Sequence, residues 1–167
     1  MKFCFKGILA LLLSVFFISC NSPTEQKPDS EATEKNFVRS EQKPTFFESH
    51  EPKKKTAPFS DIVKVGETYY LAGQIGMDHK TRKLVDATIE GQTKKTLENI
   101  KEVLSEHKLH MTDVVKVTVI LDHIEDFQAF NKVYEQYFPQ KPARSTFAAE
   151  ALAAGALIEI EVIAVRQ

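Results

Sequence analysis

The hydrophobic positions of the chain change their spacing several times, and each change predicts a new element. Three short apolar runs predict strands, over residues 46–47, 62–65 and 69–72. Gly66 and the lysine stretch 53–55 interrupt them, as turn and loop residues do. From residue 88 to 107, apolar side chains recur every three or four positions among strong helix formers, which predicts an amphipathic helix.

Alternation of apolar and polar side chains over residues 114–121 predicts a half-buried strand. Four residues form its apolar side: Val115, Val117, Val119 and Leu121. Helical spacing returns over residues 125–138, and Pro139 prevents that helix from continuing. Residues 143–150 and 157–165 then predict two strands, separated by a turn of small residues.

The order of these elements indicates an α+β fold, with one mixed sheet and two helices on a single face. Four residues of the last strand suit the face that the helices cover: Ile158, Ile160, Val162 and Ala164. The opposite face mixes acidic and apolar side chains: Leu157, Glu159, Glu161, Ile163 and Val165. Exposed apolar surface of this kind usually marks an interface, so we expect a closed homo-oligomer built on the open face of the sheet.

The N-terminal segment is typical of an export signal. Two lysines precede the apolar run 7–18, which is too short to span a bilayer comfortably, so residues 1–19 are predicted to form a signal peptide. The segment Phe17-Ile18-Ser19-Cys20 resembles the lipobox of bacterial lipoproteins, which predicts lipidation at Cys20. This places the protein in a bacterial cell envelope, on the periplasmic side or at the outer membrane, with the membrane as partner. An ordinary signal peptide with an incidental Cys20 is the alternative.

Residues 20–43 predict a flexible tether, and residues 44–167 the folded domain. The tether is rich in polar residues and proline, and its bulky apolar pair, Phe37 and Val38, is too small to offset the entropy of ordering the chain. At 167 residues and 43% hydrophobic content, the chain can bury one core but is too short for two full domains.

Charge and cysteine content narrow the functional classes. The 22 Lys and Arg residues are balanced by 23 Asp and Glu residues, for a net charge of −1, so no nucleic acid is expected as a partner. Cys4 falls within the predicted signal peptide, and no cysteine follows Cys20, so the mature domain lacks a thiol for disulfides, thiolate catalysis or cysteine-ligated zinc. The five histidines show no metal-ligand spacing, and no metal site is predicted.

Two residues near the C-terminus suggest chemistry. In the segment Lys141-Pro142-Ala143-Arg144-Ser145-Thr146, Arg144 offers a planar guanidinium that binds a carboxylate through two parallel hydrogen bonds. Glu159 lies in an otherwise apolar strand, where a half-buried carboxylate can orient or deprotonate a water molecule. Together they predict a pocket for a small carboxylate substrate. The plainer alternatives are a surface arginine after a turn, and a glutamate that pairs with an arginine of another copy.

Several short motifs occur in an order and spacing that resemble one family. They are Ala72-Gly73-Gln74-Ile75, Glu98-Asn99-Ile100-Lys101, Asp126-Phe127 followed by Asn131 and Tyr134, Pro142-Ala143-Arg144-Ser145, and Ile158-Glu159-Ile160-Glu161. Over residues 44–167 the chain resembles the RidA (YjgF) family of imine and enamine deaminases.

The resemblance implies a chorismate-mutase-like protomer that forms a homotrimer, whose sheets build a central barrel with a cleft between each pair of subunits. Each cleft would hold a small 2-imino or enamino acid and release ammonia, without a metal or organic cofactor. By position, Arg144 would grip the substrate carboxylate and Glu159 would orient the attacking water. The other residues that the resemblance places at the cleft are Phe59, Ala72, Gly73, Gln74, Asn131, Tyr134 and Thr146.

Departures from the family pattern leave two functions open. The family usually has a tyrosine at Phe59, a serine at Ala72, a proline at Gly76 and a cysteine at Thr146. Loss of a hydroxyl at Phe59 or Ala72 can cost about 1–3 kcal/mol of binding. The chain is therefore expected to be either a hydrolytic deaminase or a module that binds a small carboxylate, such as a 2-oxo acid, without turnover. Asn131 can contribute to the site or serve as a structural amide, and Gln74 can line the cleft or cap the sheet edge.

Overall fold

The computed structural model describes residues 42–167, which include the whole predicted domain. The predicted signal peptide, the lipidation site Cys20 and residues 21–41 of the predicted tether lie outside the described residues. Within the described part of the chain, no helix is long and apolar enough to cross a membrane.

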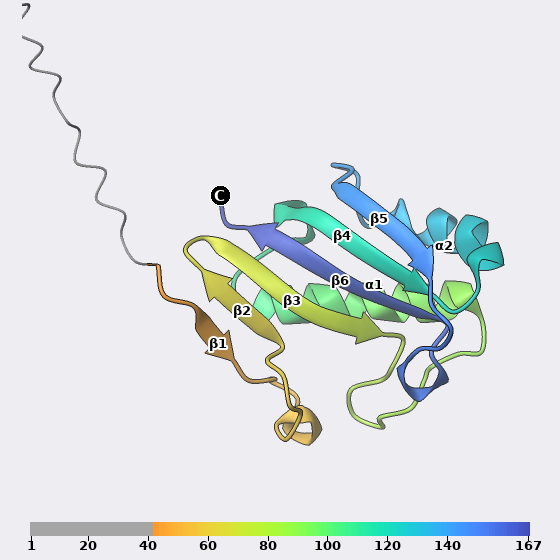
Figure 1. The fold of residues 1–167 in the computed structure, drawn as a ribbon, viewed down its shortest axis with the longest axis horizontal. Helices are drawn as coiled ribbons and strands as arrows, with labels where there is room; N and C mark the ends of the chain where they lie inside the picture. The colour runs from red at the N-terminus through yellow and green to blue at the C-terminus, as the bar shows by residue number, and fades with distance from the viewer. Residues whose placement is uncertain (1–41) are drawn as a thin grey trace, which may run out of the picture. The chain divides into compact units, whose positions relative to one another are not determined.

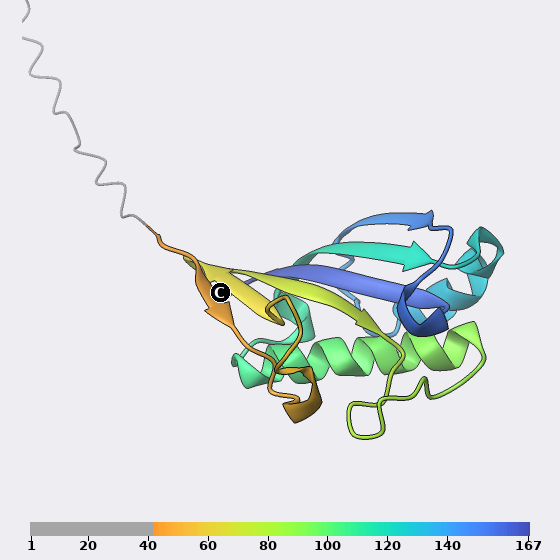
Figure 2. The same ribbon diagram turned by 60° about the horizontal axis from the view of Figure 1, so that its bottom comes forward.

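A single mixed sheet forms the centre of the domain (Figure 1). Its strands are β1 (Thr45–Phe47), β2 (Ile62–Val65), β3 (Thr68–Ile75), β4 (Val114–Leu121), β5 (Ala143–Ala148) and β6 (Ile158–Val165). They lie in the order β1-β2-β3-β6-β4-β5, and all pairs are antiparallel except β4 with β5. The helices α1 (Ile89–Glu106) and α2 (Phe127–Tyr134) both cover the same face, as Figure 2 shows for α1 along its length. The predicted α+β fold is thus confirmed.

Local chemistry sets the ends of α1. The Thr88 hydroxyl accepts a hydrogen bond of 3.1 Å from the backbone N–H of Gly91, which caps the first turn. At the other end, Lys108 adopts a positive φ of 58°, and the N–H of Leu109 returns to the Leu104 carbonyl at 3.0 Å. Between these ends, one face of the helix enters the core through residues that are fully buried: Leu97, Ile100, Val103 and Leu104.

The faces of β6 agree with the predicted alternation, whereas those of β4 agree only in part. Ile158, Ile160, Val162 and Ala164 are all buried under the helices. In β4, Val115 was expected on the buried side but is 47% exposed, while Val114 is only 2% exposed. The pairing of β4 with β6 shifts register between Val114 and Lys116, because one extra residue bulges out there and turns Val115 to the other face.

Helix α2 is shorter than the predicted span 125–138. It is preceded by a 3-10 turn at Ile124–Asp126 and ends at Tyr134. Beyond it, the N–H groups of Gln136 and Tyr137 bond to carbonyls three residues earlier, so the chain tightens into turns. Pro139 disfavours helical geometry at the residue before it, and these turns instead bury Phe138 in the core.

The open face of the sheet carries exposed aromatic side chains. Phe46, Tyr70 and Phe147 are 68%, 46% and 48% exposed. They lie in β1, β3 and β5, so the apolar surface extends across the sheet. This is the apolar face expected from the sequence, and the homotrimer built on it stays a prediction because a single copy is described.

Candidate functional site

Arg144 lies on the edge strand β5, on the side of the sheet that the helices cover. It pairs in register with Val117 of β4, which in turn pairs with Val162 of β6. Val117 and Val162 are both buried against the helices. Residues in register across neighbouring strands share a face, so the Arg144 side chain points toward α2 rather than toward the open face.

The Arg144 guanidinium is held by residues of α2. Its Nη1 donates a hydrogen bond of 2.8 Å to Oδ1 of Asn131. The guanidinium carbon lies 4.6 Å from the ring centre of Tyr134, 5.1 Å from that of Phe130 and 5.6 Å from that of Phe127. Each ring face attracts the cation, and together with the amide they fix its direction. Asn131 is therefore a positioning residue for Arg144.

Within the described residues, Arg144 uses one of its donors. The described residues 42–167 give its guanidinium a single hydrogen bond and no ion-pair partner. A hollow of about 540 Å³ opens beside it, and its lining includes Tyr134, Phe138, Lys141 and the carboxylate-bearing Glu135, which makes no ion pair with Arg144 in the described residues. A guanidinium that forms no ion pair within the described residues, beside such a hollow, can bind the carboxylate of a small anion.

Two other predicted site residues lie on the same side. Thr146 faces the helices two residues beyond Arg144, in register with the buried Val119, and its hydroxyl is buried without a hydrogen-bond partner in the described residues. Tyr134 is likewise buried, and its hydroxyl has no hydrogen-bond partner among residues 42–167. Burial raises the pKa of Tyr134, and the positive charge of Arg144 opposes that shift.

Glu159 lies on the open face of the sheet, against a bulge in β3. The pairing of β3 with β6 shifts between Leu71 and Gln74, which leaves Gly73 in the bulge. A Cβ atom on Gly73 would clash with the Glu159 carboxylate, so glycine here makes room for that side chain. Burial raises the pKa of Glu159, and the nearby charge of Glu161 raises it further.

The Glu159 carboxylate borders a second hollow of about 230 Å³. Phe59, Gly73 and Gln74 line it, and Phe59 is 54% exposed. Gln74 is buried, and its Nε2 donates to the Ala72 carbonyl at 3.2 Å. Ala72 lies in the bulge, and its N–H bonds to the Asp61 carbonyl at 2.9 Å, but its side chain does not border this hollow.

One wall of this hollow is strongly polar, and the sequence did not predict it. The buried Glu51 carboxylate ion-pairs with Arg82 at 3.0 Å and with Lys54 at 3.4 Å. Lys54 also pairs with Asp61 at 2.9 Å. Asn99 donates from Nδ2 to the carbonyls of Ile75 and Met77, while its buried Oδ1 has no partner in the described residues. Of the residues in this wall, Asn99 is the one that belongs to a motif shared with the family, and the motif alone does not indicate that Asn99 lines a hollow.

Arg144 and Glu159 of one chain do not meet. Glu159 pairs with Ile120 of β4, three residues beyond the Val117 that pairs with Arg144. An odd separation places the two side chains on opposite faces of the sheet, about 10 Å apart along the strands and about 10 Å across them. The predicted site residues therefore form two groups, one around Arg144 under α2 and one around Glu159 on the open face.

This architecture, with two helices on a mixed six-stranded sheet, is that of the chorismate-mutase-like α+β class. The chain belongs to the Endoribonuclease L-PSP family, which it matches over residues 49–166.

Individual relatives are similar over the whole domain. A RutC family protein of Pyrococcus abyssi is 41% identical over 126 residues, which cover 75% of this chain and 98% of that protein. Human 2-iminobutanoate/2-iminopropanoate deaminase is 41% identical over 110 residues, covering 65% of this chain and 80% of the enzyme. The crystal structure of the YjgF gene product from E. coli is similar with a TM-score of 0.67 and 31% identity, covering 74% and 99% of the two chains. E. coli TdcF with bound serine has the same TM-score at 29% identity, over 74% and 99%.

Proposed function

We propose that this protein hydrolyses small 2-imino or enamino acids to 2-oxo acids and ammonia, in a cleft shared by two copies of the chain. Arg144 of one copy holds the substrate carboxylate, and Glu159 of its neighbour acts on the attacking water. The copies assemble through the open faces of their sheets into a homotrimer.

The observation that carries this proposal is the separation of Arg144 from Glu159 within one chain. Each residue borders a hollow that can hold a ligand. Arg144 has donors without a partner in the described residues beside the first hollow, and the pKa of Glu159, at the edge of the second hollow, is raised. Because they lie on opposite faces, a single molecule can touch both only if a second copy supplies one of them. The exposed aromatic residues of the open face give such a copy a surface to cover.

The relatives favour deamination as the reaction. A human relative is named for 2-iminobutanoate and 2-iminopropanoate, and a solved relative contains serine, so both names point to small carboxylates. The family description names an endoribonuclease, but the net charge of −1 gives no excess of positive charge for an RNA backbone.

The chemistry requires one water molecule and two proton transfers. Water attacks the carbon of the protonated imine, and the Glu159 carboxylate accepts a proton from that water as the C–O bond forms. The hydroxyl proton of the resulting carbinolamine moves to its nitrogen as the C–N bond breaks, so that ammonia leaves with a 2-oxo acid as the second product, and Glu159 releases its proton to solvent. Burial makes the Glu159 carboxylate more basic than an exposed one, which assists the first transfer.

Binding without turnover is the second candidate, and Phe59 is the observation that favours it. Phe59 borders the Glu159 hollow with a ring that offers no hydroxyl. The structure places the Ala72 side chain outside that hollow, so Phe59 is the departure that bears most directly on the water. In this case the same cleft retains a 2-oxo acid through Arg144 and does not accelerate hydrolysis.

We also propose that the domain acts outside the cytoplasm, tethered to a bacterial envelope membrane through a lipid on Cys20. The apolar run 7–18 and the segment Phe17-Ile18-Ser19-Cys20 support this proposal. Metabolic labelling with a fatty acid tests it, because label should enter the wild-type chain and not Cys20→Ser.

The function is tested by ammonia release from 2-iminobutyrate generated in situ. We expect wild type to accelerate release, and Arg144→Ala to reduce kcat/KM by about 10- to 100-fold, since a lost charge-assisted hydrogen bond costs about 1.5–3 kcal/mol. Lys132→Ala, an exposed change on the same helix as Asn131, is the matched control and should leave the rate unchanged. Equal rates for wild type and Arg144→Ala would refute the deaminase, and calorimetric binding of 2-oxobutyrate that Arg144→Ala abolishes would then favour the binding module.

A further inference from the structure

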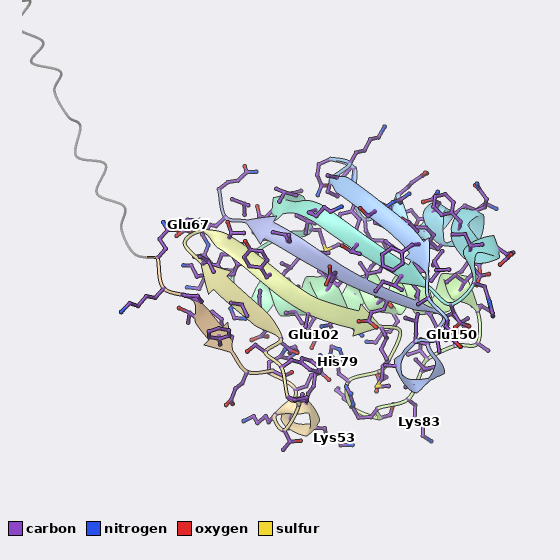
Figure 3. The ribbon with its side chains drawn as sticks, in the orientation of Figure 1. Lys53, Glu67, His79, Lys83, Glu102 and Glu150 are labelled. Atoms are coloured by element: carbon purple, nitrogen blue, oxygen red, sulfur yellow. The ribbon has the colours of Figure 1, made fainter. Side chains whose placement is uncertain are left out.

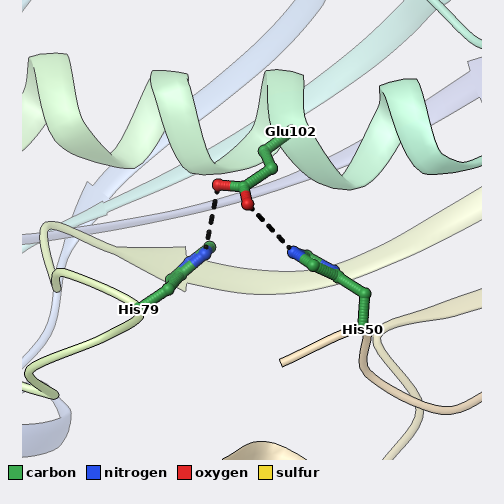
Figure 4. A group of neighbouring side chains, drawn as sticks. All are labelled: His50, His79 and Glu102. Carbon is green, nitrogen blue, oxygen red and sulfur yellow. Dashed lines mark hydrogen bonds and ion pairs between the residues drawn. The ribbon is translucent and has the colours of Figure 1, made fainter. Parts of the chain in front are cut away.

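Three side chains from distant parts of the sequence converge beside α1. His50 follows β1, His79 lies in the connection between β3 and α1, and Glu102 lies on α1 itself. Figure 4 shows both imidazoles directed at the Glu102 carboxylate, and Figure 3 shows His79 and Glu102 at the side of the domain. The sequence did not predict this group, because the two histidines stand in separate loops without ligand spacing.

Two distances within this group, each to a different oxygen of Glu102, are close to those between ligands of one metal ion. Nε2 of His50 lies 3.2 Å from Oε1 of Glu102, and Nδ1 of His79 lies 3.2 Å from Oε2. Two ligand atoms that each sit 2.0–2.1 Å from a tetrahedral zinc ion are about 3.3 Å apart. One ligand atom from each of the three residues lies within 4.8 Å of the other two. Side-chain rotations would bring all three atoms to bonding distance from one ion.

Each imidazole also has a carboxylate on its far side. Nε2 of His79 faces Oε1 of the buried Glu51 at 3.2 Å. Nδ1 of His50 lies 4.0 Å from Oδ2 of the buried Asp61. A carboxylate behind the second nitrogen is the usual support for a histidine that binds a metal, because it fixes the tautomer and orients the ring.

This support leaves one contact unexplained. When His79 is neutral and carries its proton on Nε2, toward Glu51, it presents the lone pair of Nδ1 to the Glu102 carboxylate. Nδ1 is buried and makes no hydrogen bond within the described residues. A cation bound between Nδ1 of His79 and Oε2 of Glu102, which lie 3.2 Å apart, would give both atoms a partner.

We propose that His50, His79 and Glu102 bind one divalent transition-metal cation of the zinc class. Two imidazole nitrogens and one carboxylate form a donor set that zinc accepts, with a further position left to water. Glu102 is 49% exposed, which provides a path for the ion from solvent. A hollow of about 420 Å³, lined also by Pro52, Lys53 and Lys80, lies at the same place.

The ion would join three elements that otherwise contact one another through side chains. It would tie the loops after β1 and β3 to α1, and so fix the wall of the Glu159 hollow. His79 and Glu51 border both that hollow and the one at the metal group. The proposal does not depend on the deaminase activity, because its test is metal binding alone.

The test uses the full chain without a histidine tag, freed of metal with a chelator and titrated with Zn²⁺ by calorimetry. We expect one ion per chain and a rise in Tm on binding. Co²⁺ used as a spectroscopic probe should give visible absorption bands typical of nitrogen and oxygen ligands in a four- or five-coordinate site. Glu102→Gln and His79→Gln should each weaken Zn²⁺ binding by more than about 100-fold, beyond the loss typical of a second-shell change.

Glu102→Gln is the decisive variant, because a half-exposed side chain on a helix surface can be replaced without unfolding the domain. His123→Gln is the matched control, since His123 is 70% exposed and, within the described part of the chain, pairs with its neighbour Asp122 alone. It should bind Zn²⁺ as wild type does. A wild type that shows no saturable binding, or a Glu102→Gln variant that binds equally well, would overturn the proposal and leave a histidine–carboxylate group bridged by protons alone.

Discussion

The surroundings of Arg144 and those of Glu159 differ in what holds the functional group. Three aromatic rings and one amide of α2 surround Arg144, so its direction is set by packing within the core layer. Glu159 instead lies over a glycine in a strand bulge, beside ion-paired charged residues from two loops. The Arg144 guanidinium is thus held by the rings and the amide of one helix, whereas the Glu159 carboxylate depends on a strand bulge and on loops.

This difference suggests that Arg144 and Glu159 have separate roles, in substrate binding and in proton transfer. A fixed guanidinium is suited to selecting and orienting an anion, which is a matter of binding. A carboxylate with a raised pKa beside a small hollow is suited to moving protons, which is a matter of rate. Changes on the two sides should therefore affect different kinetic constants.

The largest effect is expected from Glu159→Gln. Loss of the group that accepts the proton should lower kcat by about 10²- to 10⁴-fold with little change in KM. Because burial disfavours the charged carboxylate in the folded chain, the same variant should be at least as thermally stable as wild type at neutral pH. Glu161→Gln, two residues further along the same strand, is the matched control and should keep its activity. A Glu159→Gln enzyme with normal kcat would remove Glu159 from the mechanism.

The pH dependence sharpens the same comparison. Glu159 works as a base, so activity should fall as pH decreases through its pKa, which burial raises above the ordinary 4.5. Glu161→Gln removes a charge that raises this pKa, and should shift the acid limb of the kcat profile to slightly lower pH. If Arg144 of a second copy adjoins Glu159, Arg144→Ala should shift the acid limb of the residual activity to higher pH. Unmoved acid limbs in both variants would contradict this assignment.

A smaller effect is expected on the Arg144 side from Asn131→Ala. The change removes the 2.8 Å hydrogen bond that directs the guanidinium but leaves the aromatic rings in place. We expect KM to rise about tenfold while kcat stays within about twofold. Gln128→Ala, an exposed change on the same helix, should leave both constants unaltered. A fall in kcat at constant KM would show that Asn131 takes part in the chemistry itself.

The sequence predicted an element well where its apolar residues kept one regular spacing along the whole element. The regular alternation in β6 gave its buried face correctly, because no bulge interrupts that strand between Ile158 and Val165. In β4 the same reasoning placed Val115 on the wrong face, because the extra residue in a bulge leaves no mark on hydrophobic alternation. The predicted end of α2 at residue 138 was also wrong. The helix ends at Tyr134, because the chain before Pro139 tightens into turns instead of continuing the helix.

The candidate site was predictable only in its residue types. The motifs indicated Arg144 and Glu159, but the opposite faces they occupy follow from the register of β4 with β5 and β6. The group of His50, His79 and Glu102 depends on contacts between residues 23 to 52 positions apart, and local patterns do not encode such contacts.

The most direct test of a site divided between copies mixes two inactive chains. Arg144→Ala and Glu159→Gln are co-expressed, and ammonia release from 2-iminobutyrate is compared with that of each variant alone. In a randomly mixed symmetric oligomer, about a quarter of the clefts should combine an intact Arg144 with an intact Glu159, so activity should return to about that fraction of wild type. Activity no higher than the average of the two separate variants would contradict a shared cleft.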